Sequence, residues 1–196
     1  MKLYFLRHAS TETAENGLSH YGTNPSLSVK GKEESLSFYN LYSGIDFSCI
    51  YCSESVRTQE TVSDFGVDIQ VDHRLNELNW GQDPNLIIDE ISKVVREWRK
   101  GKLEVKTSGG ESYQDIVEKF IRFLSYLESK HGADDNILIC SHGRTLSIII
   151  SYLLKDVGNS MQYLMNPAGL TIIDPKSFSF DSNSFSFNER GHLLLL

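Results

Sequence analysis

The sequence has few cysteines and no long apolar run, and both shortages limit what the chain can be. Only three of its 196 residues are cysteine. An odd and small number of thiols does not supply a disulfide framework and favours a reducing, cytoplasmic location. No apolar stretch reaches the roughly 20 residues that span a membrane. Met1-Lys2 leads directly into a short apolar run without the pattern of a signal peptide. We therefore expect a cytoplasmic protein without a membrane partner.

Recognisable metal-ligand spacings are also missing. The six histidines form no His-x-x-x-His pair, and Cys49 and Cys52 form a Cys-x-x-Cys inside an apolar run that is typical of a strand. Residues three apart on a strand point to opposite faces, so the two thiols do not easily share a metal. We interpret them as core cysteines and predict a protein with no metal and no cofactor.

Positively charged residues are fewer than acidic ones. Lysine and arginine total 19 against 26 acidic residues, which gives a formal net charge of −7 and a pI near 5.3. This balance argues against nucleic acid as the main partner. The hydrophobic content of 40% is ordinary for a globular protein. With no internal repeat and no linker, we expect residues 1–196 to form a single domain.

Apolar runs and helical periodicity alternate along the chain. Strands are predicted at residues 2–6, 47–51, 69–71, 137–140 and 170–173. Helices are predicted from Ser28, over 55–65 and 85–99, from 111 to about 130, and over 144–155. Residues 12–27 read as a long loop, and alternating phenylalanines at 178–187 predict a hairpin that turns near 181–183. The alternation predicts an α/β fold, a three-layer sandwich with a mainly parallel central sheet.

Polar side chains follow the two most apolar strands. The first strand ends in Arg7-His8, and the strand at 137–140 ends in Ser141-His142-Gly143. Ligands bind at the carboxyl ends of such strands, and an imidazole beside a guanidinium is suited to phosphate chemistry. Taken alone, the first pair is more simply explained as a surface arginine and a histidine bonded to the main chain.

Five short motifs that follow one another along the chain remove that ambiguity. They are Arg7-His8-Ala9-Ser10-Thr11, Ser53-x-x-x-Arg57-x-x-x-Thr61, Leu75-x-Glu77 with Gly81, Gly110-Glu111-Ser112, and Ser141-His142-Gly143. Together, from residue 2 to about 155, they resemble the histidine phosphatase superfamily, also called the phosphoglycerate mutase-like family. The chain departs from the family pattern in four places. These are Ala9 for a glycine, Ala14 for an asparagine, Gly81-Gln82-Asp83-Pro84 for Trp-Glu-Gly, and Lys119 for an arginine.

The resemblance implies a role for each matching residue. His8 would attack phosphorus and carry the phosphoryl group, and Glu77 would act as general acid and then general base. His142 would donate to the phosphoryl oxygens and, if protonated, add a third cation. Phosphate binding would fall to Arg7, Arg57, Thr11 and Gly143.

The same resemblance favours hydrolysis over mutase chemistry. Glu77 and His142 are about 65 positions apart, which is similar to the shorter phosphatase branch and leaves only a small helical cap around residues 82–110. We therefore expect a metal-independent phosphomonoester hydrolase acting on a small phosphorylated metabolite. A phosphoglycerate mutase-type phosphotransferase and a catalytically weak phospho-ligand- or protein-binding regulator remain open. The basic stretch from Arg96 to Lys106 either meets a second anionic group or is a solvated helix end. Oligomeric state is left open.

Overall fold

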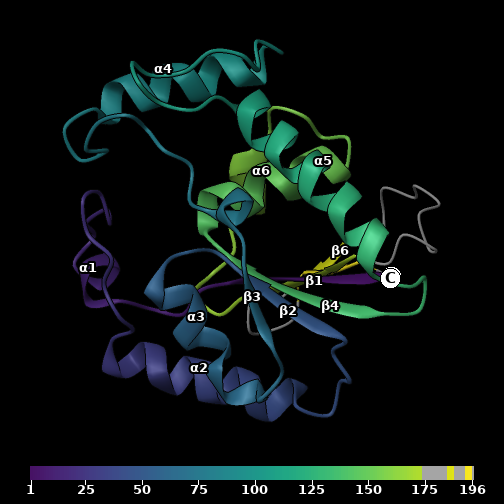
Figure 1. Cartoon of the computed structure of the whole chain (residues 1–196). Helices are drawn as coiled ribbons and strands as arrows, with labels where there is room; N and C mark the ends of the chain where they lie inside the picture. Colours follow the sequence, from purple (N-terminus) through teal and green to yellow (C-terminus); the bar gives the residue numbers. More distant parts are fainter. Residues whose placement is uncertain (174–184, 188–192, 196) are drawn as a thin grey trace.

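The structure, a computed structural model, describes residues 1–173, 185–187 and 193–195. One sheet of seven strands runs through it in the order β3-β2-β4-β1-β5-β7-β6 (Figure 1). The strands are β1 Lys2–Arg7, β2 Cys49–Cys52, β3 Ile69–Val71, β4 Asn136–Ser141, β5 Leu170–Ile173, β6 Phe185–Phe187 and β7 Leu193–Leu195. The first four are mutually parallel, while β5 runs antiparallel to β1. The predicted α/β fold with a mainly parallel sheet is confirmed.

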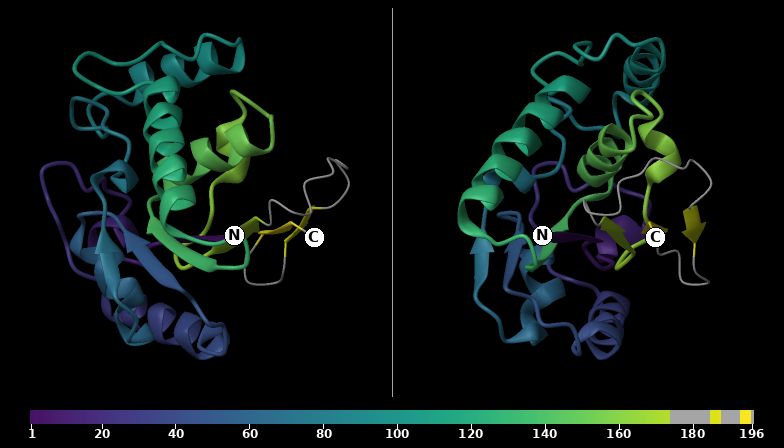
Figure 2. Two further views of the ribbon diagram at one scale, coloured as in Figure 1. Left: turned by 45° about the vertical axis from the view of Figure 1, so that its right-hand side comes forward. Right: turned by 90° about the vertical axis from the view of Figure 1, so that its right-hand side faces the viewer.

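Helices cover both faces of the sheet, which explains why its central strands are continuously apolar. Leu3 and Phe5 of β1 pack into the core beneath α5 (Tyr113–Lys130) and α6 (Gly143–Leu153). Tyr4 and Leu6, whose side chains alternate with these, pack on the opposite face with α2 (Val29–Tyr42) and α3 (Val56–Val62). Figure 2 shows the resulting three layers.

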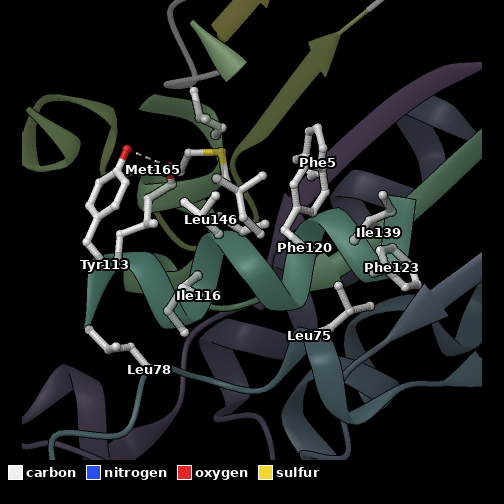
Figure 3. Close-up of a cluster of buried hydrophobic side chains, with 14 of the residues drawn as sticks. Phe5, Leu75, Leu78, Tyr113, Ile116, Phe120, Phe123, Ile139, Leu146 and Met165 are labelled. Carbon is white, nitrogen blue, oxygen red and sulfur yellow. Dashed lines mark hydrogen bonds between the residues drawn. The ribbon is translucent and has the colours of Figure 1, made fainter. Parts of the chain in front are cut away.

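The core on the α5 side fixes the carboxyl ends of the central strands β1 and β4. Phe5 and Ile139 from the sheet meet Phe120 and Phe123 from α5, and each is at most 1% exposed (Figure 3). The phenylalanines lie on the helix face predicted from the 3.6-residue period. Because this packing fixes β1 and β4 relative to one another, the residues that follow them also have fixed positions.

Helix ends follow the local sequence signals. Ser28 caps α2 by accepting from the Gly31 N–H, and Ser112 begins α5 with a reciprocal capping box to Asp115. After α3, a 3₁₀ turn over Ser63–Phe65 ends at Gly66, whose φ of 63° is left-handed. The predicted helix starts at Ser28 and after Gly110 are therefore confirmed.

One prediction in the first part of the chain is wrong, and another is met only in part. Residues 12–27 are not entirely loop, because a short helix, α1 (Glu12–Glu15), begins after Thr11. Of the apolar residues that we expect on α2, Tyr39 and Tyr42 are partly buried, whereas Val29 is 74% and Leu36 is 52% exposed. The buried face of α2 includes Gly31, where a Cβ would lie 2.0 Å from the Ser10 carbonyl oxygen. The close approach of α2 to Ser10 depends on a residue without a side chain, and a search for apolar periodicity does not find such a residue.

The segment from 82 to 110, which we call the cap segment, contains α4 (Ile88–Arg99). This helix begins three residues later than the predicted start at residue 85. Trp98 of α4 is buried and stacks on Trp80, with ring centroids 5.8 Å apart. In Figure 1 the cap segment lies above the sheet, and α1 lies to the left of the sheet.

The basic stretch from Arg96 to Lys106 begins in the last turn of α4, and its lysines form local ion pairs. Lys100 and Lys102 bind Glu97, with nitrogen–oxygen distances of 2.6 and 2.8 Å, and Lys106 binds Asp115 at 2.9 Å. All three lysines are largely solvent-exposed at their side chains. This arrangement matches the solvated-helix-end reading of the stretch.

Other sequence predictions have mixed outcomes. Cys49, Cys52 and Cys140 are free thiols, and the last two are buried. The turn predicted at 181–183 lies outside the described residues. Over the part of the chain that is described, no helix combines the length and apolar character needed to cross a bilayer. The single-domain organisation of residues 1–196 stays a prediction.

Candidate active site

The ends of β1 and β4 bring two histidines together. Arg7 is paired with Ser141 in the parallel register, and the His8 N–H donates to the Ser141 carbonyl at 2.9 Å. The ring centroids of His8 and His142 are 5.3 Å apart. Both histidines therefore emerge at the same edge of the sheet.

His8 is held in one tautomer. Its Nδ1 lies 2.7 Å from the Ala9 carbonyl, so this nitrogen carries the proton and donates it to that oxygen. Burial first, and then the positive charge of Arg57, lowers the pKa of His8 to about 3. The ring is therefore neutral at physiological pH, and Nε2 keeps a free lone pair. This is the state that a nucleophilic imidazole requires.

The turn after His8 is fixed by side chains from other elements. The Ala9 N–H donates to Thr61 Oγ1 of α3 at 3.0 Å, and the Ser10 N–H donates to Glu34 Oε2 of α2 at 2.8 Å. Among the described residues, the only non-glycine residues with positive φ are Lys155 and Ala168. Position 9 thus tolerates alanine, because its backbone does not need the left-handed conformation.

Two guanidinium groups of the site, Arg57 buried and Arg7 half-buried, have no ion-pair partner among the described residues. Arg57 is 3% exposed, and the Nε atoms of both Arg7 and Arg57 are buried without a hydrogen-bond partner. Across the described part of the chain, no carboxylate lies within 4.0 Å of either group. Burial lowers the pKa of both arginines. Since a buried charge without a partner is costly, this arrangement favours binding of an anion.

His142 makes contacts that differ from the sequence expectation. Arg57 Nη2 donates to His142 Nδ1 at 3.0 Å, and His142 Nε2 donates to Ser53 Oγ at 2.8 Å. Burial and the neighbouring Arg57 keep the pKa of His142 well below its usual value. His142 is therefore neutral here and does not add a third cation. Its Nδ1 accepts a hydrogen bond that orients Arg57.

Gly143 makes room for Arg7. A Cβ at this position would lie 3.2 Å from both Cζ and Nε of the Arg7 guanidinium. Arg7 Nη1 also donates to the Met165 carbonyl at 2.6 Å, which fixes the other end of the group. The glycine predicted for phosphate binding thus leaves space for the Arg7 guanidinium.

Glu77 faces the same region and is held through one oxygen. Its Oε1 accepts from the backbone N–H of Thr145 at 3.2 Å and of Leu78 at 3.1 Å. In the described part of the chain, Oε2 has no hydrogen-bond partner. The Gly110-Glu111-Ser112 motif supports this turn, because Glu111 Oε2 accepts from the Asn79 N–H at 2.9 Å. The motif therefore begins α5 and also stabilises the extended segment that follows Glu77.

Sequence reasoning missed His20. Thr11 Oγ1 lies 2.7 Å from His20 Nε2, and the His20 ring centroid is 5.7 Å from that of His8. Burial and the charges of Arg57 and Arg7 lower the pKa of His20 to about 4. The Thr11 hydroxyl also accepts from the Ala14 N–H, so it is already engaged in the ligand-free site. His20 lies in a polar loop outside every motif, and no sequence signal distinguishes it.

A cleft of about 570 Å³ opens beside these residues, and His20, Arg57 and Glu77 are among the side chains that line it. We call Arg7, His8, Arg57, Glu77 and His142 the inner pocket. The outer walls are the parts of residues 17–21 and 84–92 that line the cleft. Arg144 also lines it and was not predicted, although it directly follows Gly143. Burial lowers the pKa of Arg144, and the charge of Glu77 opposes this.

No metal site is evident in the part of the chain that is described. No group of three or more histidine, cysteine, aspartate or glutamate side chains there is arranged to hold an ion. The three histidines of the site instead face one another and two arginines.

Comparison with known proteins places this geometry in a family context. The chain is 27% identical over 162 residues to adenosylcobalamin/alpha-ribazole phosphatase of Escherichia coli, with 79% of each covered. It is 28% identical over 164 residues to a probable phosphoglycerate mutase of Salmonella choleraesuis, covering 79% of this chain and 75% of that one. Human 6-phosphofructo-2-kinase/fructose-2,6-bisphosphatase 1 is 26% identical over 171 residues, which are 84% of this chain and 35% of that enzyme.

Solved structures agree on the fold. Mycobacterial glucosyl-3-phosphoglycerate phosphatase complexed with VO3 superposes with a TM-score of 0.74 at 22% identity, covering 87% of this chain and 90% of that one. A putative alpha-ribazole-5'-P phosphatase from Escherichia coli gives 0.71 at 24% identity, covering 100% and 95%. The family model described as histidine phosphatase superfamily (branch 1) matches residues 3–187. From its fold and its sequence, the chain belongs to the histidine phosphatase superfamily.

Proposed function

We propose that the protein is a metal-independent phosphomonoester hydrolase that acts on a small phosphorylated metabolite through a phosphohistidine at His8. One observation carries this proposal. A neutral imidazole with a free Nε2 lone pair lies beside two guanidinium groups whose buried Nε atoms have no hydrogen-bond partner and which pair with no carboxylate. A phosphate ester supplies both the missing anion and the electrophile.

In the first half-reaction, His8 Nε2 attacks phosphorus while the bond to the leaving oxygen breaks. Arg7 and Arg57 neutralise the charge on the phosphoryl oxygens, and their unpartnered Nε atoms supply two donors. His142 contributes by holding Arg57 through Nδ1, and Gly143 by leaving space for Arg7. The Thr11 hydroxyl donates a hydrogen bond to the phosphoryl group after it turns away from His20.

Glu77 transfers the protons. Its unbonded Oε2 gives a proton to the leaving alkoxide as the phosphorus–oxygen bond breaks. In the second half-reaction, the same oxygen accepts a proton from water as that water attacks phosphorus. The phosphorus–nitrogen bond then breaks, inorganic phosphate leaves, and His8 returns to its neutral state. The anchored Oε1 keeps Oε2 directed into the cleft in both halves.

The openness of the cleft favours hydrolysis over mutase chemistry. Leu18, Tyr21 and Ile88 line it and are each more than half exposed. Water therefore has access to an intermediate that a mutase must protect. A non-catalytic regulator has no need for an imidazole with a free lone pair, and its site does not require an acid beside the phosphate.

The test is phosphate release from a panel of phosphomonoesters, measured in excess chelator, with product analysis for transfer to a second acceptor. We expect stoichiometric inorganic phosphate that chelator does not reduce. Arg57→Ala should suppress release, whereas Arg122→Ala, on the exposed face of α5, should not. Transfer to an acceptor without net hydrolysis would instead support the mutase, and binding without turnover would support the regulator.

A further inference from the structure

We propose that the alcohol portion of the substrate is apolar and carries no second phosphate, an inference that rests on the proposed phosphatase function. The inner pocket defines where the phosphate binds, and the outer walls define what can be attached to it. The outer walls carry exposed apolar side chains and no lysine or arginine, whereas the inner pocket is polar and positively charged.

Exposure separates the two levels of the cleft. Arg57 is 3% exposed and forms its floor, while Leu18, Tyr21 and Ile88 are 55%, 51% and 62% exposed at its mouth. These three side chains come from two separate segments, residues 17–21 and α4, which face the same cleft. Large apolar side chains exposed on both sides of one opening are typical of a site that an apolar ligand covers.

The cations of the cleft belong to one cluster. Arg7, Arg57 and Arg144 each have Glu77 among the charges that shift their pKa values. Contacts agree with this: Arg57 donates to His142, Arg7 packs against Gly143, and Arg144 precedes Thr145, whose N–H donates to Glu77. The three arginines therefore gather near the acid, where the transferred phosphoryl group would lie. One such cluster matches one dianionic group.

The outer walls supply no further positive charge. The part of α4 that lines the cleft consists of Ile88, Ile91 and Ser92. The basic residues between 96 and 106 do not line it, and Lys100, Lys102 and Lys106 are paired with Glu97 and Asp115. A second phosphate at the mouth would meet apolar side chains and neutral polar ones such as Ser19 and Asn85, and would lose hydration without gaining an ion pair.

The test compares n-hexyl phosphate with 1,6-hexanediol bisphosphate, which have the same scissile bond and chain length. We expect kcat/KM to be at least about tenfold higher for the monophosphate, on the scale of discrimination by an apolar pocket. Ile88→Lys should raise kcat/KM for the bisphosphate and lower it for the monophosphate. Leu86→Lys is the matched control, because Leu86 is 82% exposed on the same segment but does not line the cleft.

The outcomes separate this inference from the proposed function. Hydrolysis of both esters with equal efficiency, or a preference for the bisphosphate in the unmodified protein, would overturn the inference and leave the phosphatase intact. Failure to hydrolyse either ester or p-nitrophenyl phosphate would overturn the phosphatase. In that case calorimetric titration with the same pair decides the inference, since equal affinities or tighter binding of the bisphosphate would contradict it.

Discussion

The inner pocket and the outer walls of the cleft are constructed in opposite ways. His8, Arg57 and His142 are at most 3% exposed, and each is bonded to the main chain or to another buried side chain. Leu18 and Ile88 are more than half exposed and project from a loop and from the start of a helix. The cleft therefore combines a fixed polar network with a rim that exposes large apolar side chains.

This difference separates chemistry from selectivity. Phosphoryl transfer depends on donors held in fixed positions, and the packed ends of β1 and β4 supply them. The outer walls belong to segments outside the sheet, so their side chains can be replaced without disturbing the packing that holds the nucleophile. Substitutions in the two regions should therefore have distinct signatures: loss of rate in the pocket, and altered substrate preference at the rim.

Glu77→Gln should give the largest effect among the variants that keep the nucleophile. It keeps size and polarity but removes the transferable proton, so hydrolysis of alkyl phosphates should slow by about 10²–10⁴-fold. With p-nitrophenyl phosphate, whose leaving group needs little help, the phosphorylation burst should survive. Stopped-flow measurement of the burst checks this, with exposed Glu128→Gln as control. Equal slowing of the burst for alkyl and aryl esters would remove Glu77 from the acid role.

Gly143→Ala tests whether the pocket places its arginines by close packing. The new Cβ would meet Arg7 Cζ and Nε at 3.2 Å and displace the guanidinium. The loss of one charge-assisted contact should weaken vanadate binding by about 10–100-fold. Gly132→Ala is the control, because a Cβ there meets only Asp135 at 3.8 Å. Unchanged affinity in Gly143→Ala would mean that Arg7 does not bind the anion.

The depressed pKa of His8 predicts a pH dependence of folding. The unfolded chain binds a proton near pH 6.5, whereas folded His8 binds one only near pH 3. Its contribution to stability is complete above pH 6.5 and is lost as pH falls from 6.5 towards 3. The slope is at most about 1.4 kcal/mol per pH unit.

Urea unfolding across this pH range checks the prediction. His8→Asn should lessen the acid-side slope, whereas His73→Asn, at an exposed residue, should leave it unchanged. An identical slope in His8→Asn and the unmodified protein would show that the pocket does not hold His8 neutral.

Ser112→Ala should give the smallest effect and tests the support of the Glu77 turn. Loss of the capping box should lower the free energy of unfolding by about 1 kcal/mol. Because Glu111 next to it bonds the Asn79 main chain, a modest fall in kcat should accompany this. Exposed Ser37→Ala provides the comparison. A loss of stability with no change in kcat would mean that the start of α5 does not position Glu77.

The strands and the motifs that follow them were predictable from sequence because their signals are local. The continuous apolar run of β1, the capping serines at 28 and 112, and Gly66 each act within a few residues. The exposed start of α4 was misplaced because Asn85 and Leu86 fit the helical period but lie in the preceding turn.

The site contacts that were missed depend on tertiary packing. His20 reaches Thr11 across a loop, and Thr145 reaches Glu77 over 68 positions in the chain. The neutral state of His142 depends on Arg57, which comes from a different element. Residue types and spacing locate such groups near one another, but only the packed structure shows which atom donates and which accepts.

Trapping the covalent intermediate tests the central claim most directly. The protein is mixed rapidly with a labelled phosphomonoester and quenched in alkali, and the labelled peptide is mapped after digestion. We predict an acid-labile, base-stable phosphoryl group on His8, with no label and no turnover in His8→Ala. Label on another residue, or full activity of His8→Ala, would contradict the account.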